Sequence, residues 1–232
     1  MNEVRSRYLA ELGIPVFTLR TPKRAAAETA SIVAEPPSAL TDRVASEEVW
    51  SELAERVRGC MRCALHKTRT QTVFGVGRRD ARLLVIGEAP GADEDRQGEP
   101  FVGRAGQLLN AMLRSIGLPR GEVYIANILK CRPPNNRDPL PEEASCCTPY
   151  LSQQIALVQP RVLLAVGRIS AQWLLQTDTP IGRLRGRALT FGERNIPLVV
   201  TYHPAYLLRS PLAKATAWTD LCLVKDLLDQ SQ

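Results

Sequence analysis

The chain has 232 residues and a formal net charge of +6 at pH 7, and 44% of its residues are hydrophobic and 23% charged. This length suits one well-packed domain with an appendage, and the composition is that of an ordinary globular protein. Because no run of eighteen apolar residues occurs, and the first residues carry Glu3 and Glu11 without an apolar stretch, we expect a cytoplasmic protein with neither a membrane span nor a secretory signal.

The positive charge lies in the later part of the chain. Residues 1–50 hold six Lys and Arg against seven Asp and Glu, whereas residues 51–232 hold 24 against 17. A basic segment of this kind is a mild indication of an anionic partner such as nucleic acid.

The first fifty residues give weak structural signals. Residues 2–12 are consistent with a short helix that Gly13 ends, and residues 21–46 are rich in Ala, Thr, Ser, Glu and Pro, a composition typical of a flexible linker. We predict an N-terminal arm and linker over residues 1–46 and a folded domain over residues 47–232, whose first helix covers residues 47–58. The arm would be an inert extension or a tether to a replication or repair protein.

Four short apolar runs predict strands that are buried on both faces, as in a parallel sheet. These runs occupy residues 83–86, 123–126, 162–166 and 198–201. Helical patterns separate them, over residues 108–116 before Gly117 and over residues 148–158, where Thr148 and Pro149 suit a helix start. A last helix is expected to bury one face, formed by Trp218, Leu221, Val224 and Leu228. Alternating strands and helices predict an α/β fold, a three-layer α/β/α sandwich around a four-stranded parallel sheet.

Polar residues follow the predicted strands at the points where the strands end. They are Glu88, Asn127, Ser170 and His203. Since ligands bind beyond the carboxyl ends of parallel strands, we expect a site at this edge of the sheet. The sequence has no GxxxxGK phosphate loop and lacks the His-x-Glu and Pro-Cys-x-x-Cys motifs of zinc deaminases, which excludes those two classes.

Six cysteines are unusual for a chain in which no disulfide framework is expected. They are Cys60, Cys63, Cys131, Cys146, Cys147 and Cys222. The first two form a CxxC pair that can chelate one metal centre across a tight turn. Together with thiols from two later segments, the pair favours a four-thiolate iron–sulfur cluster, with zinc or unligated thiols as alternatives. Cys222 lies between two leucines of a predicted helix and is expected in the core.

Three sequence blocks resemble the iron–sulfur (family 4) uracil-DNA glycosylases. They are Gly-Glu-Ala-Pro-Gly at 87–91 with Pro-Phe-Val-Gly-Arg-Ala-Gly at 100–106, then Asn127 with Lys-Cys-Arg-Pro-Pro at 130–134 and Asn-Arg-Asp-Pro at 136–139, and His-Pro-Ala-Tyr-Leu-Leu-Arg at 203–209. The resemblance covers roughly residues 59–228. It implies an α/β/α fold, hydrolytic removal of uracil from DNA, association with the nucleoid, and a [4Fe–4S] cluster held by Cys60, Cys63, Cys131 and Cys147, with Cys146 as a spare.

The resemblance also implies how the base is bound. Phe101 would stack on a uracil flipped out of DNA, and Gly87, Ala89 and Pro90 would belong to the same pocket. The amide of Asn127 matches N3–H and O4 of uracil, whereas cytosine presents the opposite polarity at these positions. Judged without the family, Phe101 suits the core equally well, and Asn127 suits a turn or helix cap.

Two residues are the candidates for bond cleavage. His203 would donate to the negative charge that develops at O2 of the departing uracil. Glu88 would stabilise the cationic sugar or position water, and Glu94 and Asp95 are alternatives for that role. Other uracil glycosylase families place an Asp where this chain has Ala89, and its absence favours a largely dissociative mechanism.

The last block further predicts contacts to DNA. Apolar residues would wedge into the minor groove, while basic side chains and backbone amides would hold phosphates. The candidates are Ser170, Pro204, Ala205, Tyr206, Leu207, Leu208, Arg209 and Lys214. We expect a monomeric enzyme acting on single- and double-stranded DNA. One alternative is a relative that binds or covalently traps uracil-DNA, although the segment between Cys131 and Cys147 lacks the His that trapping would use. Another is a DNA-binding module without enzymatic activity.

Overall fold

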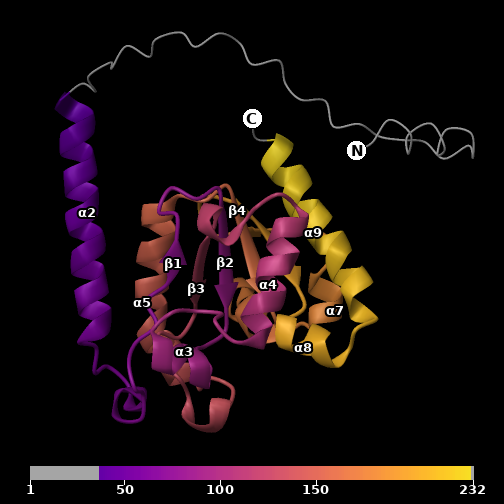
Figure 1. Cartoon of the computed structure of the whole chain (residues 1–232), viewed down its shortest axis with the longest axis horizontal. Coiled ribbons are helices and arrows are strands. Elements are labelled where there is room, and N and C mark those ends of the chain that lie inside the picture. The colour runs from indigo at the N-terminus through magenta and orange to yellow at the C-terminus, as the bar shows by residue number, and fades with distance from the viewer. Residues whose placement is uncertain (1–36, 231–232) are drawn as a thin grey trace, which may run out of the picture. The chain divides into compact units, whose positions relative to one another are not determined.

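The computed structural model of the chain describes residues 37–230 (Figure 1). Its strands are β1 (Val76–Gly77), β2 (Leu83–Gly87), β3 (Tyr124–Asn127), β4 (Val162–Val166), β5 (Ala188–Phe191) and β6 (Ile196–Thr201). Its α-helices are α2 (Pro37–Arg58), α3 (Ala92–Gln97), α4 (Arg104–Ser115), α5 (Pro141–Val158), α6 (Arg168–Leu175), α7 (Ile181–Leu184), α8 (Pro204–Arg209) and α9 (Ala213–Gln230). Short 3-10 helices η1 (Ala64–Lys67), η2 (Arg120–Glu122) and η3 (Pro134–Asn136) lie in connecting segments.

The strands form one mixed sheet in the order β1-β3-β2-β4-β6-β5. Its four central strands are parallel, with Val85 of β2 paired to Ile125 of β3 and Leu164 of β4. The prediction of a four-stranded parallel sheet is therefore wrong for the sheet as a whole, because the antiparallel strands β1 and β5 extend its edges. β1 has two residues, and the residues of β5 are exposed and half-buried in alternation, so neither strand gives an unbroken apolar run.

Helices cover both faces of the sheet, with α2 and α5 on one side and α4, α8 and α9 on the other (Figure 1). Successive strand residues point to opposite faces, so each strand contributes to two cores. One core joins Leu84 and Ile86 to side chains of α2, α5 and α6, and the other joins Leu83 and Val85 to α4 and α9. The layered α/β arrangement that the sequence predicts is therefore present.

Helix α5 begins seven residues before the predicted start at Thr148, at Pro141. Pro141 takes the first helical position, and the Glu143 carboxylate accepts the backbone N–H of Leu140 at 2.9 Å, which caps the helix. Pro149 lies inside the helix. The Thr-Pro pair was therefore a misleading start signal, and Cys146 and Cys147 lie on a helix instead of a loop.

Helices α4 and α9 match their predictions in part. The N–H of Gly117, which has a left-handed φ of 78°, closes α4 on the carbonyl of Arg114, as predicted. In α9 the buried face is Ala217, Leu221, Val224 and Leu228. Trp218 is 46% exposed, and Cys222 is half-buried, so neither has the fully buried position expected of it. No helix among residues 37–230 has the length and apolar character that crossing a membrane requires.

Helix α2 begins at Pro37, ten residues before the predicted start. From residue 47 onward its buried side chains are Trp50, Leu53 and Val57. The predicted helix over residues 2–12 and most of the predicted linker lie outside the described residues. The domain boundary at residues 46 and 47 stays a prediction.

Candidate active site

A cavity of about 510 Å³ opens beyond the carboxyl ends of β2, β3 and β6. Its lining is drawn from segments far apart in the sequence: Glu88, Ala89, Pro90, Gly91, Glu94, Phe101, Ala105, Asn127, Pro133, Asn136, Arg137, Asp138, His203, Ala205, Tyr206 and Arg209. The structure thus brings the predicted base-binding and catalytic residues to one edge of the sheet, as expected for an open parallel arrangement.

Gly87, at the end of β2, allows two side chains of the cavity wall to approach its backbone closely. A Cβ at this position would lie 2.3 Å from Oδ1 of Asn127 and 2.7 Å from Cζ of Phe101. Asn127 is 2% exposed, and its Oδ1 has no hydrogen-bond partner within the protein. A buried acceptor without a partner costs free energy unless a ligand supplies a donor. The amide is therefore placed to receive a ring N–H.

Phe101 has a strained backbone and a fixed ring. Its φ is 54°, a left-handed value that costs a non-glycine residue on the order of 1–3 kcal/mol. The ring is 7% exposed, and its centroid lies 5.8 Å from the His203 ring at an interplanar angle of 30°. A Cβ at Gly106 would lie 1.8 Å from the Phe101 carbonyl oxygen, so α4 also packs closely on this turn.

His203 caps helix α8 and is held in one tautomer. Its Nδ1 accepts the backbone N–H of Ala205 at 3.1 Å, so the proton of the neutral ring is on Nε2. The pKa of His203 is lowered to about 4, mainly by burial and also by the charge of Arg209, while Glu94 acts in the opposite direction. The imidazole is thus neutral near pH 7 and carries one N–H donor.

Glu88 is a partly buried carboxylate in the cavity wall. Its pKa is raised to about 7, mainly by burial and also by the charge of Asp138, while Arg168 acts in the opposite direction. Asp138 lies in the same cavity wall and pairs with Arg168 at 2.7 Å. No role was predicted for Asp138 from the sequence, although this residue belongs to the second of the three blocks that resemble the family.

The two alternatives to Glu88 brace neighbouring loops. The Glu94 carboxylate accepts backbone N–H groups of Gly91, Val102 and Gly103 at 3.1, 3.0 and 3.2 Å. Asp95 is buried and accepts the backbone N–H of Thr70 at 3.0 Å from both oxygens. Both carboxylates already have donors, which leaves Glu88 as the predicted carboxylate with room to act.

The predicted DNA contacts lie in different environments. Residues 204–209 of the last block form helix α8, and His203 is its cap. Tyr206 and Leu208 are 40% and 37% exposed, whereas Leu207 is 1% exposed and packs in the core. Ser170 is buried and donates to the carbonyl of Gly167, and Pro204 is buried. Ala205 and Arg209 line the cavity, but Lys214 lines a separate apolar cavity beside α9.

Five of the six thiols lie near enough to interact electrostatically with at least one other, and these are Cys60, Cys63, Cys131, Cys146 and Cys147. Cys131 and Cys147 are buried, and each interacts electrostatically with Cys63. Arg69 Nη1 donates to Cys131 Sγ at 3.0 Å. Cys60 also interacts electrostatically with Cys131, and both Cys60 and Cys63 are half-buried. No three His, Cys, Asp or Glu side chains among residues 37–230 converge closely enough to bind a single metal ion.

Lys130 connects Cys147 to Asn127 in the cavity wall. Its backbone N–H donates to Cys147 Sγ at 3.3 Å, and its fully buried Nζ donates to the Asn127 carbonyl at 2.8 Å and to Gln154 at 2.6 Å. The sequence reasoning quoted Lys130 only as part of a block. No periodicity or motif chemistry signals a buried lysine, because its burial depends on the packing of α5 against β3.

The chain matches the family model described as "Uracil DNA glycosylase superfamily" over residues 74–223. Three similar proteins bear the name "Type-4 uracil-DNA glycosylase". That of Archaeoglobus fulgidus is 41% identical over 191 residues, which are 80% of this chain and 96% of the relative. That of Pyrobaculum aerophilum is 42% identical over 178 residues, 74% and 91% of the two chains. That of Thermotoga maritima is 44% identical over 167 residues, 71% and 85% of the two chains.

Proposed function

The chain belongs to the uracil-DNA glycosylase superfamily, and we propose that it removes uracil from DNA by hydrolysing the N-glycosidic bond, which leaves an abasic site. The observation that carries this proposal is the unpartnered Oδ1 of Asn127, buried in one cavity with Phe101 and His203. The names of the three relatives support the same reaction. A cavity of this kind receives a base only after the base leaves the helix, so the uracil is flipped out of the stack.

Uracil is recognised by its edge and its face. The Asn127 oxygen accepts N3–H of uracil, and the amide N–H₂ of the same residue donates to O4. Cytosine carries an acceptor at N3 and a donor at C4. Against the Asn127 amide it would therefore place an acceptor opposite an acceptor and a donor opposite a donor. Phe101 supplies an apolar face against which the flat ring packs, and base–aromatic stacking contributes about 1–3 kcal/mol.

Bond cleavage leaves negative charge on the uracil and positive charge on the sugar. The Nε2–H of neutral His203 donates to O2 of the departing base, because Nδ1 is already engaged by the Ala205 N–H. Glu88 is the carboxylate that stabilises the sugar cation or orients the water that captures it. Since Ala89 stands where related families carry an Asp, the water attacks late, after the bond to uracil is largely broken.

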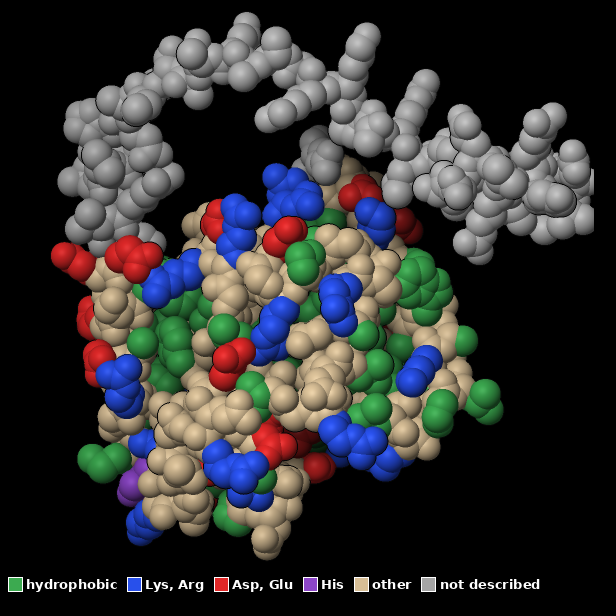
Figure 2. Space-filling view, viewed as in Figure 1, with side chains coloured by type: hydrophobic (Ala, Val, Ile, Leu, Met, Phe, Trp, Pro, Cys, Tyr) green, Lys and Arg blue, Asp and Glu red, His purple; other side chains and the backbone are tan. Residues whose placement is uncertain are grey.

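DNA is held by α8 and by the basic side chains around it. Tyr206 and Leu208 are the exposed apolar side chains available to enter the minor groove, and Arg209 provides a charge at the cavity rim. Leu207, Pro204 and Ser170 are buried, so their part is to shape the backbone that meets the DNA. Lys and Arg side chains spread over the face seen in Figure 2 instead of forming one patch. Several separate phosphate contacts are therefore expected.

We further propose that Cys60, Cys63, Cys131 and Cys147 bind a [4Fe–4S] cluster, as the resemblance to family 4 implies. Each thiolate binds a different iron of such a cluster, so the sulfurs lie near one another without converging on one ion. Cys60 and Cys63 in the segment after α2, Cys131 after β3 and Cys147 on α5 would hold the cluster, which would then cross-link these three parts of the chain. Cys146 has another partner, because its Sγ lies 3.4 Å from the carbonyl oxygen of Arg62.

Iron and sulfide content test the cluster. Purified wild-type protein is expected to contain about four of each and to show broad visible absorbance. Cys147→Ala should lose iron, whereas the neighbouring Cys146→Ala should keep it. Zinc without iron in the wild-type protein would contradict the proposal.

Uracil release from labelled oligonucleotides tests the enzymatic proposal. Wild-type protein should yield alkali-labile abasic sites in both single- and double-stranded DNA, and Asn127→Ala should be slower by roughly 100-fold. Asn195→Ala is the matched control, since this amide lies in the exposed turn between β5 and β6, outside the cavity. An adduct that survives denaturation would indicate a trapping protein, and binding without release a DNA-binding module; either result contradicts the proposal.

Three further points are proposed together with the reaction. The enzyme acts as a monomer, its N-terminal arm over residues 1–46 contacts a replication or repair protein, and it is associated with the nucleoid of the cytoplasm. Size-exclusion chromatography with light scattering tests the first point. Deletion of the arm followed by a partner pull-down tests the second, and fluorescence microscopy of a tagged chain tests the third.

A further inference from the structure

We propose that Arg120 is a positioning residue for uracil release, which acts through Phe101 by fixing the turn that carries the stacking ring; this inference rests on the function proposed above. Arg120 begins the 3-10 helix η2 between α4 and β3. It is not among the residues that line the cavity. Its effect on a bound base therefore has to pass through other residues.

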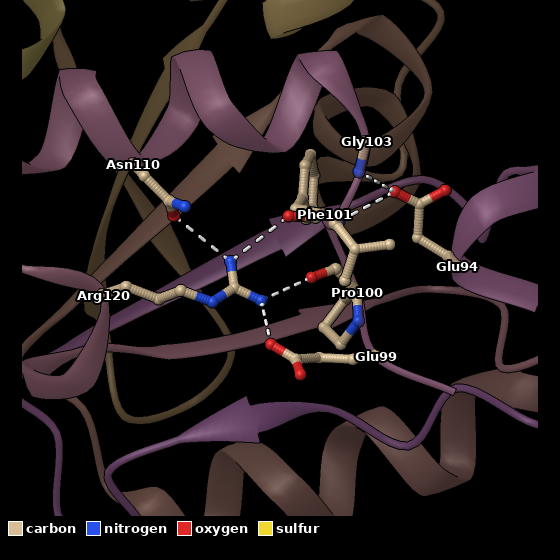
Figure 3. Close-up of polar contacts among 8 residues, drawn as sticks. Glu94, Glu99, Pro100, Phe101, Gly103, Asn110 and Arg120 are labelled. Carbon is tan, nitrogen blue, oxygen red and sulfur yellow. Dashed lines mark hydrogen bonds and ion pairs between the residues drawn. The ribbon is translucent and has the colours of Figure 1, made fainter. Parts of the chain in front are cut away.

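The guanidinium holds two successive carbonyls of the turn (Figure 3). Nη2 donates to the carbonyl of Pro100 at 2.6 Å, and Nη1 donates to the carbonyl of Phe101 at 3.4 Å. The same two nitrogens also contact Glu99 Oε1 at 2.7 Å and Asn110 Oδ1 at 3.3 Å. Arg120 thus joins both carbonyls of the turn to α4 and to a neutralising carboxylate.

The turn is held from its other side by Glu94. That carboxylate accepts the N–H groups of Val102 and Gly103, the two residues that follow Phe101 (Figure 3). The carbonyls of Pro100 and Phe101 are therefore held by the Arg120 guanidinium. The backbone N–H groups of the two residues that follow are held by the Glu94 carboxylate. Phe101 lies between them with its positive φ of 54°. A backbone conformation that side chains disfavour persists only where the surroundings enforce it.

Arginine suits this position better than lysine. Its planar fork reaches two carbonyls with separate nitrogens, whereas an ammonium on a flexible stem has no fixed geometry. The Arg120 side chain is 22% exposed, so water competes only partly for these donors. Loss of the fork frees the turn to relax its φ, which moves the Phe101 ring away from the His203 ring and from the bound base. A misplacement of about 1 Å is enough to slow a reaction roughly 100-fold.

A double-mutant cycle distinguishes positioning from general support. Single-turnover uracil release is measured for the full-length wild-type protein, Arg120→Met, Phe101→Ala and the double variant. Arg120→Met should lower the maximal rate roughly 10- to 100-fold, with half-saturation by DNA changed by less than about threefold. If Arg120 acts through Phe101, the double variant should be no more than about twofold slower than the slower single variant.

Three further variants complete the design. Arg120→Lys keeps the charge and should remain about as slow as Arg120→Met, which also provides a folded variant if methionine impairs folding. Glu99→Gln removes the charge of one other partner of Arg120 and Asn110→Ala removes the second partner, and both variants should keep rates within about threefold of wild type.

Multiplicative effects in the cycle, full activity of Arg120→Lys, or a change confined to DNA half-saturation would overturn the role of Arg120. Release of uracil by the wild-type protein in the same assay shows that the proposed function stands even then. A wild-type protein that releases no uracil contradicts the proposed function itself.

Discussion

The base-binding wall and helix α8 adjoin in space but are built in opposite ways. In the wall, which we define as Gly87, Phe101, Asn127 and His203, the side chains are largely covered and their backbone positions allow few alternatives. Helix α8 instead exposes Tyr206 and Leu208 at its surface. In the function proposed above, the wall would recognise one base, and the helix would make contacts with DNA that form and break in each cycle.

The two regions meet at His203. This residue belongs to the wall through its ring contact with Phe101, and it caps α8 through the N–H of Ala205. The proposed donor for the leaving base is therefore oriented by the helix that we propose to contact DNA. Changes in the wall should act on the rate of bond cleavage, whereas changes on exposed α8 positions should act on the DNA complex.

The largest effect is expected for Gly87→Ala, which places a methyl group 2.3 Å from Asn127 Oδ1 and 2.7 Å from the Phe101 ring. Both groups have to move, so uracil release should fall by at least roughly 1000-fold in single-turnover assays. Gly182→Ala is the matched control, because nothing lies within 4 Å of its added Cβ. Near-normal activity of Gly87→Ala would show that the wall adapts to an added methyl group and is not more rigid than α8.

His203→Ala is expected to slow release roughly 100- to 1000-fold, because the leaving base loses its hydrogen-bond donor. His203→Asn should restore the cap of α8, since Asn is a good cap residue, without restoring the imidazole donor. Both variants are compared with wild type by single-turnover release and by iron content. A rate within about threefold of wild type, less than about 1 kcal/mol of barrier, would disprove the assignment of His203.

The pH dependence of uracil release tests the proposed role of the Glu88 carboxylate. Burial raises the pKa of Glu88 to about 7, and only its ionised form stabilises a cation. The wild-type rate should therefore rise as the pH increases through about 7 and level off above it. His203, whose pKa burial lowers to about 4, stays neutral over this range and adds no second limb.

Glu88→Gln provides the comparison for this profile. We expect a rate roughly 10- to 100-fold lower that no longer changes near pH 7. If the rate of Glu88→Gln still rose with pH near 7, the rise in the wild-type profile would have to come from another group. Measurement of release between pH 5 and pH 9 at saturating DNA distinguishes the two outcomes.

Much of the wall could be predicted because parallel strands end at one edge. Glu88, Asn127 and His203 follow separate buried runs in the sequence, and those runs became β2, β3 and β6. The same reasoning missed β1 and β5, since short edge strands carry no continuous apolar signal. It also missed Arg120 and Asp138, which reach the site region only through tertiary packing.

Helix α8 shows a second limit of sequence reasoning. The motif Tyr-Leu-Leu identifies an apolar segment, but it does not tell which leucine faces the core. In the structure successive residues of α8 point in different directions, so Leu207 packs inward and Leu208 faces outward. Exposure within such a motif is decided by helix rotation, which depends on α4 and α9 packing against it.

The smallest effect on cleavage is expected for Leu208→Ala, which together with Leu207→Ala tests the difference between the two adjacent leucines. Leu208→Ala should slow release from double-stranded DNA only about three- to tenfold, with little change on single-stranded DNA or in stability, because an exposed wedge matters only where a duplex has to open. Leu207→Ala should lower the free energy of unfolding by about 2–5 kcal/mol, because it leaves a cavity in the core. Thermal melts and paired release assays on the two substrates measure both effects. If Leu207→Ala behaved like Leu208→Ala, α8 would have to rotate on binding DNA. The contrast between a fixed wall and an exposed helix would then be wrong.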